Sequence, residues 1–379
     1  MSDFSFKKLE DAKNLEGKKV LLRLDLNVPI VDGVVRDDFR IKRILPTLKF
    51  LKDAKAKIII ASHIDDNPLS TLLPVVKYLS SFYTISQFVE NIPDAPKFIG
   101  AMKNGDIIML ENVRKDPGEI TNSPKFASFL ASLGDIYVND AFAVCHREHA
   151  SIVGVPKLLQ SYAGLLLQKE ITALSEAFNP PRPFILALAG AKFETKLPLV
   201  EKFLNIADYV FVGGALANDI FKEKGYEVGR SKISTTHVNL SSVIDSPKLI
   251  VPSDVVVENS YESGVRVATA VAPGDIIVDS GPHTDAELAD LLSDMKFVLW
   301  NGPFGNYEKG FSKGTEDFAR RVIESGARSI VGGGDTVAII DKAGLVDKFS
   351  FVSTGGGAMI DFLANGTLPG IEALSNSKG

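Results

Sequence analysis

Five basic side chains in the first half of the sequence stand where apolar runs end or in the loops beyond them: Arg23, Arg40, His63, Arg114 and Arg147. A guanidinium group offers forked N–H donors whose geometry matches a phosphate or a carboxylate. The recurrence of such groups at comparable places predicts a site for a small, multiply charged anion. The alternative for each arginine taken alone is a surface salt bridge.

Asp25 and Asn27 follow the first apolar run and stand two residues apart. On an extended strand end, residues two apart lie on the same face, so this pair is predicted to hold hydroxyl groups of one ligand. Arg23 lies inside the same run. We expect it to support neighbouring carboxylates rather than to touch the ligand.

Two glycine-rich runs mark a second kind of site in the other half of the sequence, Gly332–Thr336 and Ser353–Gly357. Each closes an apolar run and precedes a segment with helical periodicity. Glycine lets backbone N–H groups approach a phosphate closely, and a helix N-terminus favours its charge. Asp335 could reach a phosphate-bound Mg²⁺, which prefers one or two carboxylates plus phosphate oxygens. The runs therefore predict a nucleotide site; tight turns are the alternative for either run alone.

Other chemical templates do not fit. The sequence has no G-x-x-x-x-G-K-[ST] run, and no G-x-G-x-x-G follows its first apolar run, which excludes the standard P-loop and dinucleotide fingerprints. His146 and His149 lack the partners of a zinc site. Cys145 is the single cysteine, so no intrachain disulfide can form, and we expect an inert thiol in a reducing, cytoplasmic compartment.

The elements that position these residues are continuous apolar runs, which are typical of strands covered on both faces in a parallel sheet. The runs are Lys19–Leu24, Lys57–Ala61, Asp106–Leu110, Asp135–Val138, Phe184–Leu188, Asp208–Val212, Lys248–Val251, Lys296–Trp300, Arg328–Val331 and Lys348–Val352. Segments with helical periodicity separate them, for example Phe39–Ala54, Leu197–Asn205 and Glu316–Ser325. Open parallel sheets bind ligands beyond the carboxyl ends of their strands, where the polar and glycine clusters stand. The fold class expected is α/β, with two doubly wound, mainly parallel sheets.

Length and charge support two domains. The chain has 379 residues with 45% apolar side chains and a net charge of −5, which argues against nucleic acid as a partner. Residues 1–164 hold 22 Lys+Arg and 20 Asp+Glu, and the remainder holds 20 Lys+Arg and 27 Asp+Glu.

The longest apolar runs are only strand-sized, so no membrane span is expected. No secretory leader is recognised at Met1–Phe4. Leu165–Ala177, ending at Asn179-Pro180-Pro181, is predicted to be the helix that connects the halves.

The sequence resembles phosphoglycerate kinases along essentially its whole length. The matching runs occur in the family's order: Arg23–Pro29, Asp37–Ile41, Leu110–Arg114, Tyr137–Phe142, His146–Ser151, Gly190–Lys192, Trp300–Pro303, Gly332–Thr336 and Ser353–Ala358. The resemblance implies reversible phosphoryl transfer between 1,3-bisphosphoglycerate and Mg-ADP, giving 3-phosphoglycerate and Mg-ATP. It also implies a cytoplasmic, monomeric, hinge-bending enzyme of glycolysis and gluconeogenesis with Mg²⁺ as cofactor and no nucleic-acid or membrane partner.

The resemblance assigns residues to roles. The triose would be held by Asp25, Asn27, Arg40, His63, Arg114 and Arg147. The nucleotide would be held by Lys196, Gly213, Gly214, Asn301, Pro303, Glu308, Gly333, Gly334, Asp335 and Thr336, with Glu308 on the ribose and Asp335 on the metal. Arg40 and Lys192 would flank the transferring phosphoryl group, helped by the backbone N–H groups of Gly356 and Gly357.

The expected domains are residues 1–164 for the triose, 165–177 for the connecting helix and 178–359 for the nucleotide. The segment from about 360 to 379 is expected to pack back on the first domain, with Leu368–Leu374 as the returning part. Because triose and nucleotide would lie on separate domains, closure about the connecting helix is implied.

The sequence departs from the family at Ser62–Pro68, where Asp65-Asp66 stands in place of the usual Gly-Arg and an acidic residue, Asp66, replaces the substrate arginine. An anion near a polyanionic ligand is unfavourable, by roughly a few kcal/mol if close and dry. Arg36 or Arg43 could restore the charge. The alternatives are a kinase with an altered acid substrate and a nucleotide-binding scaffold. Further departures are Phe193–Thr195 after Lys192 and Ala143–Cys145 before His146.

Overall fold

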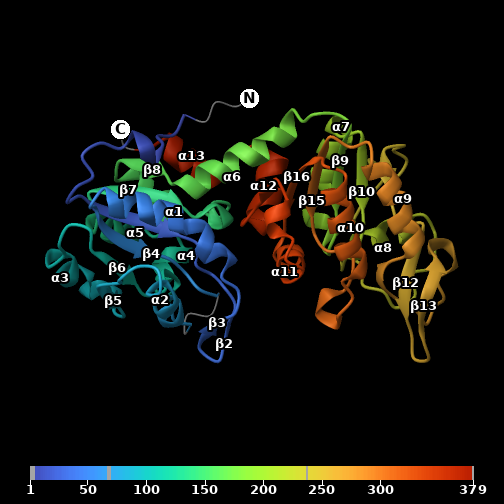
Figure 1. The fold of residues 1–379 in the computed structure, drawn as a ribbon, viewed down its shortest axis with the longest axis horizontal. Coiled ribbons are helices and arrows are strands. Elements are labelled where there is room, and N and C mark those ends of the chain that lie inside the picture. The colour runs from blue at the N-terminus through green and yellow to red at the C-terminus, as the bar shows by residue number, and fades with distance from the viewer. Residues whose placement is uncertain (1–4, 66–69, 236–237, 378–379) are drawn as a thin grey trace. The chain divides into compact units, whose positions relative to one another are not determined.

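The computed structural model describes residues 5–65, 70–235 and 238–377, and its contacts divide the chain into two compact units. The first unit comprises Met1–Thr172 and Asn365–Gly379, and the second comprises Ala173–Ala364. Helix α6 (Leu165–Ser175) carries the chain from the first unit into the second (Figure 1). The chain thus passes from the first unit to the second within α6 and returns to the first unit at Asn365.

The first unit is built on a six-stranded parallel sheet with the order β5-β6-β4-β1-β7-β8. Its strands are β1 (Lys19–Leu24), β4 (Lys57–Ala61), β5 (Gln87–Val89), β6 (Ile107–Leu110), β7 (Ile136–Asp140) and β8 (Ser161–Ala163). The helices are α1 (Phe39–Asp53), α2 (Leu73–Leu79), α3 (Ala95–Gly100), α4 (Pro117–Ile120) and α5 (Pro124–Ser132). Strand β1 pairs in parallel with both β4 and β7. Its residues Val20–Leu24 are buried, because helices cover both faces of a doubly wound sheet.

The second unit repeats this architecture, with the strand order β11-β10-β9-β15-β16-β17. The strands are β9 (Phe184–Leu188), β10 (Tyr209–Val212), β11 (Leu249–Ile250), β15 (Phe297–Asn301), β16 (Arg328–Gly332) and β17 (Phe351–Val352). The helices are α7 (Leu197–Ile206), α8 (Ala215–Glu223), α9 (Pro282–Leu292), α10 (Lys313–Glu324), α11 (Gly334–Lys342) and α12 (Gly356–Asn365). The expected α/β class with two mainly parallel, doubly wound sheets is confirmed.

The small antiparallel elements were not expected from the sequence. They are the three-stranded sheet of β12 (Asp254–Glu258), β13 (Ser263–Val267) and β14 (Ile276–Ser280), and the hairpin of β2 (Ile30–Val31) and β3 (Val34–Val35). In Figure 1, β12 and β13 form a layer of their own. Strand β13 alternates exposed and half-buried residues, unlike the continuous burial of the parallel strands. A strand with this alternation contains no continuous apolar run, which is the pattern that predicts the parallel strands.

The end of the chain belongs to the first unit. Helix α13 (Pro369–Ser375) lies beside the edge strand β8 (Figure 1). The backbone N–H of Gly370 donates to the carbonyl of Cys145 at 2.8 Å, and a β-carbon at Gly370 would lie 3.0 Å from the Sγ of Cys145. Glycine is therefore needed at this contact. In the described part of the chain, no helix combines the length and the apolar character needed to cross a membrane.

Candidate functional site

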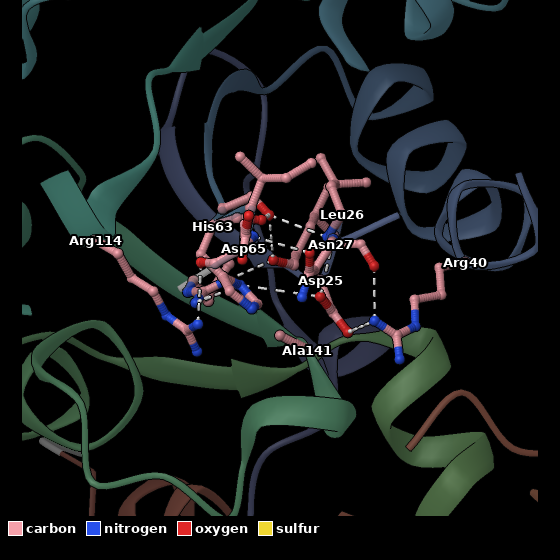
Figure 2. Close-up of polar contacts among 12 residues, drawn as sticks. Asp25, Leu26, Asn27, Arg40, His63, Asp65, Arg114 and Ala141 are labelled. Atoms are coloured by element: carbon pink, nitrogen blue, oxygen red, sulfur yellow. Dashed lines mark hydrogen bonds and ion pairs between the residues drawn. The ribbon is translucent and has the colours of Figure 1, made fainter. Parts of the chain in front are cut away.

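A polar cluster in the first unit forms where β1, β4 and β6 end. Asp25 and Asn27 follow β1, His63 follows β4, and Arg114 lies in the short turn Val113–Lys115 after β6. The carboxyl ends of parallel strands meet at one edge of the sheet, so residues far apart in sequence come together. In Figure 2, His63, Asp25, Asn27 and Asp65 lie in the middle of the cluster, with Arg40 and Arg114 on opposite sides.

Arg40 is tied to the turn after β1. Its Nη1 donates to the carbonyl of Asn27 at 2.7 Å and lies 3.3 Å from Oδ2 of Asp25. Oδ1 of Asp25 accepts the backbone N–H of Asn27 at 3.1 Å, which closes the turn. The side chain of Arg40 remains 29% exposed, so its guanidinium is anchored yet still accessible to a ligand.

Asp65 completes one side of the cluster through its backbone. Its N–H donates to Oδ1 of Asn27 at 3.0 Å, and its carbonyl accepts Nη1 of Arg114 at 3.3 Å. Its carboxylate accepts the hydroxyl of Ser70 at 3.3 Å. Asp65 adopts φ +56°, a left-handed conformation that Asp tolerates better than most residues. Asp66, on which the predicted loss of charge centres, lies outside the described residues.

Of the two arginines that could restore charge, Arg36 is exposed. The guanidinium of Arg43 lies over the ring of Phe39, 4.9 Å from its centroid. This stacking engages Arg43 on its own helix, α1. Whether either arginine offsets the acidic turn therefore stays a prediction.

Beneath the cluster, Arg23 is completely buried. Its Nε donates to Oγ of Ser151 at 2.8 Å, and its Nη2 lies 3.3 Å from Nδ1 of His63 and 3.9 Å from Oε1 of Glu119. The structure thus places Arg23 beside a carboxylate, and that it does not touch the ligand stays a prediction. The carboxylate is Glu119 on α4, which the sequence reasoning missed because no local pattern marks it.

Burial dominates the electrostatics of the two histidines at this site. It holds the pKa of His63 well below its usual range, and the charges of Arg23, Arg114 and Arg40 lower it further. Burial, followed by Arg114, Arg23 and Arg147, lowers the pKa of His149 to about 4. Arg147 itself is exposed, in the loop that follows β7. Both imidazoles are therefore neutral at physiological pH, and the arginines carry the positive charge.

The second unit has a cavity of about 230 Å³ at the carboxyl ends of its strands. Of the residues expected at the nucleotide site, it is lined by Gly214, Pro303, Glu308 and Asp335. The backbones converge tightly, since a β-carbon at Gly214 would lie 2.8 Å from the nitrogen of Gly190. The lining does not include the expected residues Lys196, Gly213, Asn301, Gly333, Gly334 and Thr336. Asn301 ends β15, Gly334 and Thr336 lie in the first turn of α11, and the other three lie in connections between a strand and a helix.

The two glycine runs lie side by side. A β-carbon at Gly356 would be 3.7 Å from the nitrogen of Gly334 and 3.8 Å from Cα of Gly333. Helices α11 and α12 begin at these runs, so their N-terminal N–H groups are close together. Nearby, Oγ1 of Thr336 is buried with no hydrogen-bond partner among the described residues. Paired helix N-termini of this kind favour a phosphate.

The lysines occupy a turn after β9. Nζ of Lys196 donates to the carbonyl of Ala189 at 2.7 Å, and burial lowers its pKa to about 8, opposed by the charge of Asp335. Lys192 is exposed and adopts φ +66°, a left-handed conformation that is costly for lysine. The next residue, Phe193, is fully buried and anchors the turn. Its N–H donates to Oγ of Ser234 at 3.2 Å.

Asp335 is exposed at the start of α11 and faces the cavity. Within the described ranges, no group of three His, Cys, Asp or Glu side chains could hold a metal ion by itself. A single carboxylate fits Mg²⁺ that takes its remaining ligands from phosphate oxygens and water. The residues present therefore suit a metal that arrives with a nucleotide.

Several residues that line the cavity were missed from the sequence, among them Asn218, Lys232, Phe304 and Asp279. Burial raises the pKa of Asp279 to about 6, against hydrogen bonds from the N–H groups of Gly314 and Ser280. Asn218 donates its amide to the carbonyl of Lys232 at 2.9 Å. Asn218 lies on α8 and Asp279 on β14, whereas Lys232 and Phe304 lie in loops, and none of the four belongs to the clusters on which the prediction was based.

Comparisons with known proteins identify the family. A family model described as phosphoglycerate kinase matches residues 9–366. A phosphoglycerate kinase of Thermosipho africanus is 39% identical, and a cytosolic phosphoglycerate kinase of Triticum aestivum is 40% identical. Each alignment covers 96% of this chain and 97% of the relative. The structure of phosphoglycerate kinase from Coxiella burnetii superposes with a TM-score of 0.84 at 36% identity, covering 98% of this chain and 100% of that chain. The crystal structure of phosphoglycerate kinase from Pyrococcus horikoshii superposes with a TM-score of 0.87 at 32% identity, covering 97% of this chain and 98% of that chain. The chain belongs to the phosphoglycerate kinase family.

Proposed function

We propose that this chain transfers a phosphoryl group reversibly between 1,3-bisphosphoglycerate and Mg-ADP, giving 3-phosphoglycerate and Mg-ATP. As a member of its family the chain is an enzyme, a phosphotransferase of glycolysis. The observation that carries the finer proposal is the pair of strand-end clusters, one rich in Arg and His and one rich in Gly and Lys. Neither a scaffold without catalysis nor another acid substrate finds support in the comparisons.

On the first unit, the triose is held by Asp25, Asn27, Arg40, His63, Arg114 and Arg147. Asp25 and Asn27 offer acceptors for hydroxyl groups beside the anchored guanidinium of Arg40. Arg114 is fixed against the carbonyl of Asp65 on the other side of the cluster. Guanidinium groups on two sides suit a ligand with charges at both ends.

On the second unit, the nucleotide is held by Lys196, Gly213, Gly214, Asn301, Pro303, Glu308 and Gly333–Thr336. Glu308 is exposed at the mouth of the cavity, where a ribose hydroxyl would find an acceptor. The phosphates would face the N-terminus of α11, and Asp335 would hold Mg²⁺. The metal would neutralise the phosphates of the nucleotide.

Arg40 and Lys192 act on the transferring phosphoryl group, with the N–H groups of Gly356 and Gly357. Its transition state spreads negative charge over equatorial oxygens, so fixed positive charge and N–H donors suffice without a protein nucleophile. Since the two ligands lie on different units, the proposal includes closure about α6, which excludes water from the reaction.

We also propose that the protein is a monomer in the cytoplasm. A relative named as cytosolic supports this location.

A coupled assay that follows ATP-dependent formation of the acyl phosphate tests the proposal. We expect turnover with 3-phosphoglycerate and loss of most kcat in Lys192→Ala, while the Kd for Mg-ADP stays unchanged. Lys224→Ala, which removes another exposed lysine of the second unit, is the matched control. A panel of other carboxylates belongs in the same assay. Absence of turnover with 3-phosphoglycerate, with Mg-ADP binding intact, would overturn the proposal.

A further inference from the structure

Three fully buried polar side chains form a chain of hydrogen bonds beneath the polar cluster of the first unit. Oγ of Ser151 lies 2.8 Å from Nε of Arg23 and 2.5 Å from Oε1 of Glu119. Glu119 also accepts the backbone N–H of Ser151 at 2.9 Å. The side chains of Arg23 and Glu119 are 0% exposed, so this carboxylate balances a guanidinium that water does not reach.

The direction of each hydrogen bond follows from the chemistry of the groups. A guanidinium can only donate, and an ionised carboxylate can only accept. The single hydroxyl proton of Ser151 must therefore go to Glu119, which leaves its lone pairs for Nε–H of Arg23. Glu119 thus orients Ser151, and Ser151 with Glu119 orients Arg23.

The other side of Arg23 faces His63. Nη2 of Arg23 donates to Nδ1 of His63 at 3.3 Å. A guanidinium only donates, so Nδ1 must accept this hydrogen bond with its lone pair. The hydrogen of the neutral imidazole must therefore be on Nε2. Oδ1 of Asp25, 3.9 Å from Nδ1, is the one described carboxylate that pairs with this nitrogen, and it favours the opposite tautomer. Arg23, at the shorter distance, prevails over it.

The charges around His63 act in the same direction. Burial and the positive charges of Arg23, Arg114 and Arg40 disfavour a protonated imidazole, and they lower the pKa of His63. A charged His63 would also place an N–H at Nδ1 against the N–H of Arg23. The side chain of His63, 2% exposed, is therefore held in one protonation state by contacts on several elements.

We propose that Glu119, acting through Ser151 and Arg23, is a positioning residue that fixes His63 as the Nε2–H tautomer. His63 then serves the site as a neutral hydrogen-bond donor rather than as a cation. An acceptor oxygen of the bound acid takes this hydrogen, which rests on the proposed function. Arg40, Arg114 and Arg147 supply the positive charge, and the Nε2–H of His63 orients the bound acid through one hydrogen bond.

The tautomer can be read directly in the free protein by ¹⁵N NMR of the histidine rings. The sequence has 5 histidines, and the signals of His63 are assigned by their loss in His63→Gln. We expect a protonated Nε2 and an unprotonated Nδ1 from pH 6 to 8. A protonated Nδ1 in the wild-type protein would overturn the proposal whatever the variants show. This measurement needs no turnover, so a failure of the proposed function would be recognised separately.

The role of Glu119 is tested by Glu119→Gln and Ser151→Ala, with Ser151→Thr as the conservative rescue that keeps the hydroxyl. In the first two variants we expect part of the His63 population to carry its hydrogen on Nδ1, toward Asp25. The KM for 3-phosphoglycerate should rise about five- to tenfold, the effect of one lost hydrogen bond, while the KM for Mg-ATP stays unchanged.

Glu90→Gln, an exposed glutamate of the same unit, is the control for the loss of one charge. Ser151→Thr should restore both the tautomer and the KM. If Glu119→Gln does not fold, Ser151→Ala, which keeps both charges, still decides the question. An unchanged tautomer in every folded variant would show that Glu119 does not set it, and the positioning role would be wrong.

Discussion

Gly164 lies directly against Asp140: a β-carbon at Gly164 would be 2.3 Å from Oδ1 of that carboxylate. The same oxygen accepts the backbone N–H of Leu167 at 2.9 Å in the first turn of α6. Asp140, at the end of β7, thus holds the N-terminus of the helix that leads to the second unit. Burial raises its pKa to about 6, although hydrogen bonds from Thr47 and from the N–H groups of Leu167 and Leu166 oppose this.

The raised pKa predicts how stability depends on pH. The folded state binds the proton of Asp140 more tightly than the unfolded state, so this group stabilises the fold below pH 4, and that contribution is lost as pH rises toward 6. Asp140→Asn keeps an acceptor oxygen but cannot ionise. As pH rises from 4 to 7, the free energy of unfolding of Asp140→Asn should therefore increase relative to that of the wild type by up to about 2–3 kcal/mol.

Urea denaturation followed by circular dichroism at each pH measures this difference. Asp135→Asn removes a half-exposed carboxylate that pairs with Lys19, and it is the matched control. A constant stability difference between Asp140→Asn and the wild type across this range would contradict the assigned pKa.

Lys196 predicts a pH dependence of nucleotide binding. Its pKa of about 8 means that it loses its charge as pH rises from 7 to 9, so it must take up a proton to pair with a phosphate above pH 8. We expect the affinity for Mg-ADP to fall over this range in the wild type and to change less in Lys196→Arg, which stays charged.

Calorimetry at pH 8.5 in buffers of different ionisation enthalpy should show proton uptake on binding of Mg-ADP to the wild type. Lys196→Arg should show none. Equal uptake by the two proteins would assign the proton to another group and contradict the role of Lys196.

The strand-end residues could be predicted from the sequence because, in a parallel sheet, every residue that directly follows a strand lies at the same edge. Asp25, His63 and Arg114 each follow a run of apolar residues, and a doubly wound sheet brings the carboxyl ends of such runs to one edge. The resemblance to the family then assigned their roles. Neither step needed any side-chain geometry.

The supporting residues could not be predicted in this way. Glu119 meets Ser151 across 32 residues, and Asn218 reaches the cavity from within a helix. Such contacts depend on helix packing angles and rotamers, which leave no periodic trace in the sequence. The left-handed backbone of Lys192 is equally hidden, because lysine rarely adopts it.

The conformation of Lys192 depends on a hydrogen bond that can be removed. Oγ of Ser234 accepts the N–H of Phe193 at 3.2 Å and donates to Oδ2 of Asp219 at 3.0 Å. Ser234→Ala leaves that N–H without its acceptor and loosens the turn, so kcat should fall about tenfold. The KM for 3-phosphoglycerate should not change.

Steady-state kinetics with both substrates measure this effect. Ser234→Thr keeps the hydroxyl and should retain most of kcat. Ser242→Ala, whose hydroxyl bonds the exposed side chain of Glu201, is the control on the same unit. A kcat in Ser234→Ala equal to that of the control would show that the turn holds without this bond.

Two glycines of the second unit both adopt positive φ, but a side chain would clash with a neighbouring backbone at only one of them. Gly302 adopts φ +101°, and a β-carbon there would lie 2.1 Å from the carbonyl oxygen of Ala189. Gly310 adopts φ +88° with no atom within 4 Å of the corresponding position. Gly310→Ala should cost about 1 kcal/mol of stability from strain alone, and Gly302→Ala about 3 kcal/mol because backbone must also move.

The fluorescence of Trp300, the single tryptophan, reports unfolding of the second unit, since it is buried and donates to the carbonyl of Gly302 at 2.9 Å. Gly302→Ala should also weaken Mg-ADP binding, because Pro303 follows it in the lining of the cavity. Gly310→Ala should leave that affinity unchanged. If both variants lose the same stability, the contact between Gly302 and Ala189 is not tight, and the close approach of β9 to β15 at the cavity would be refuted.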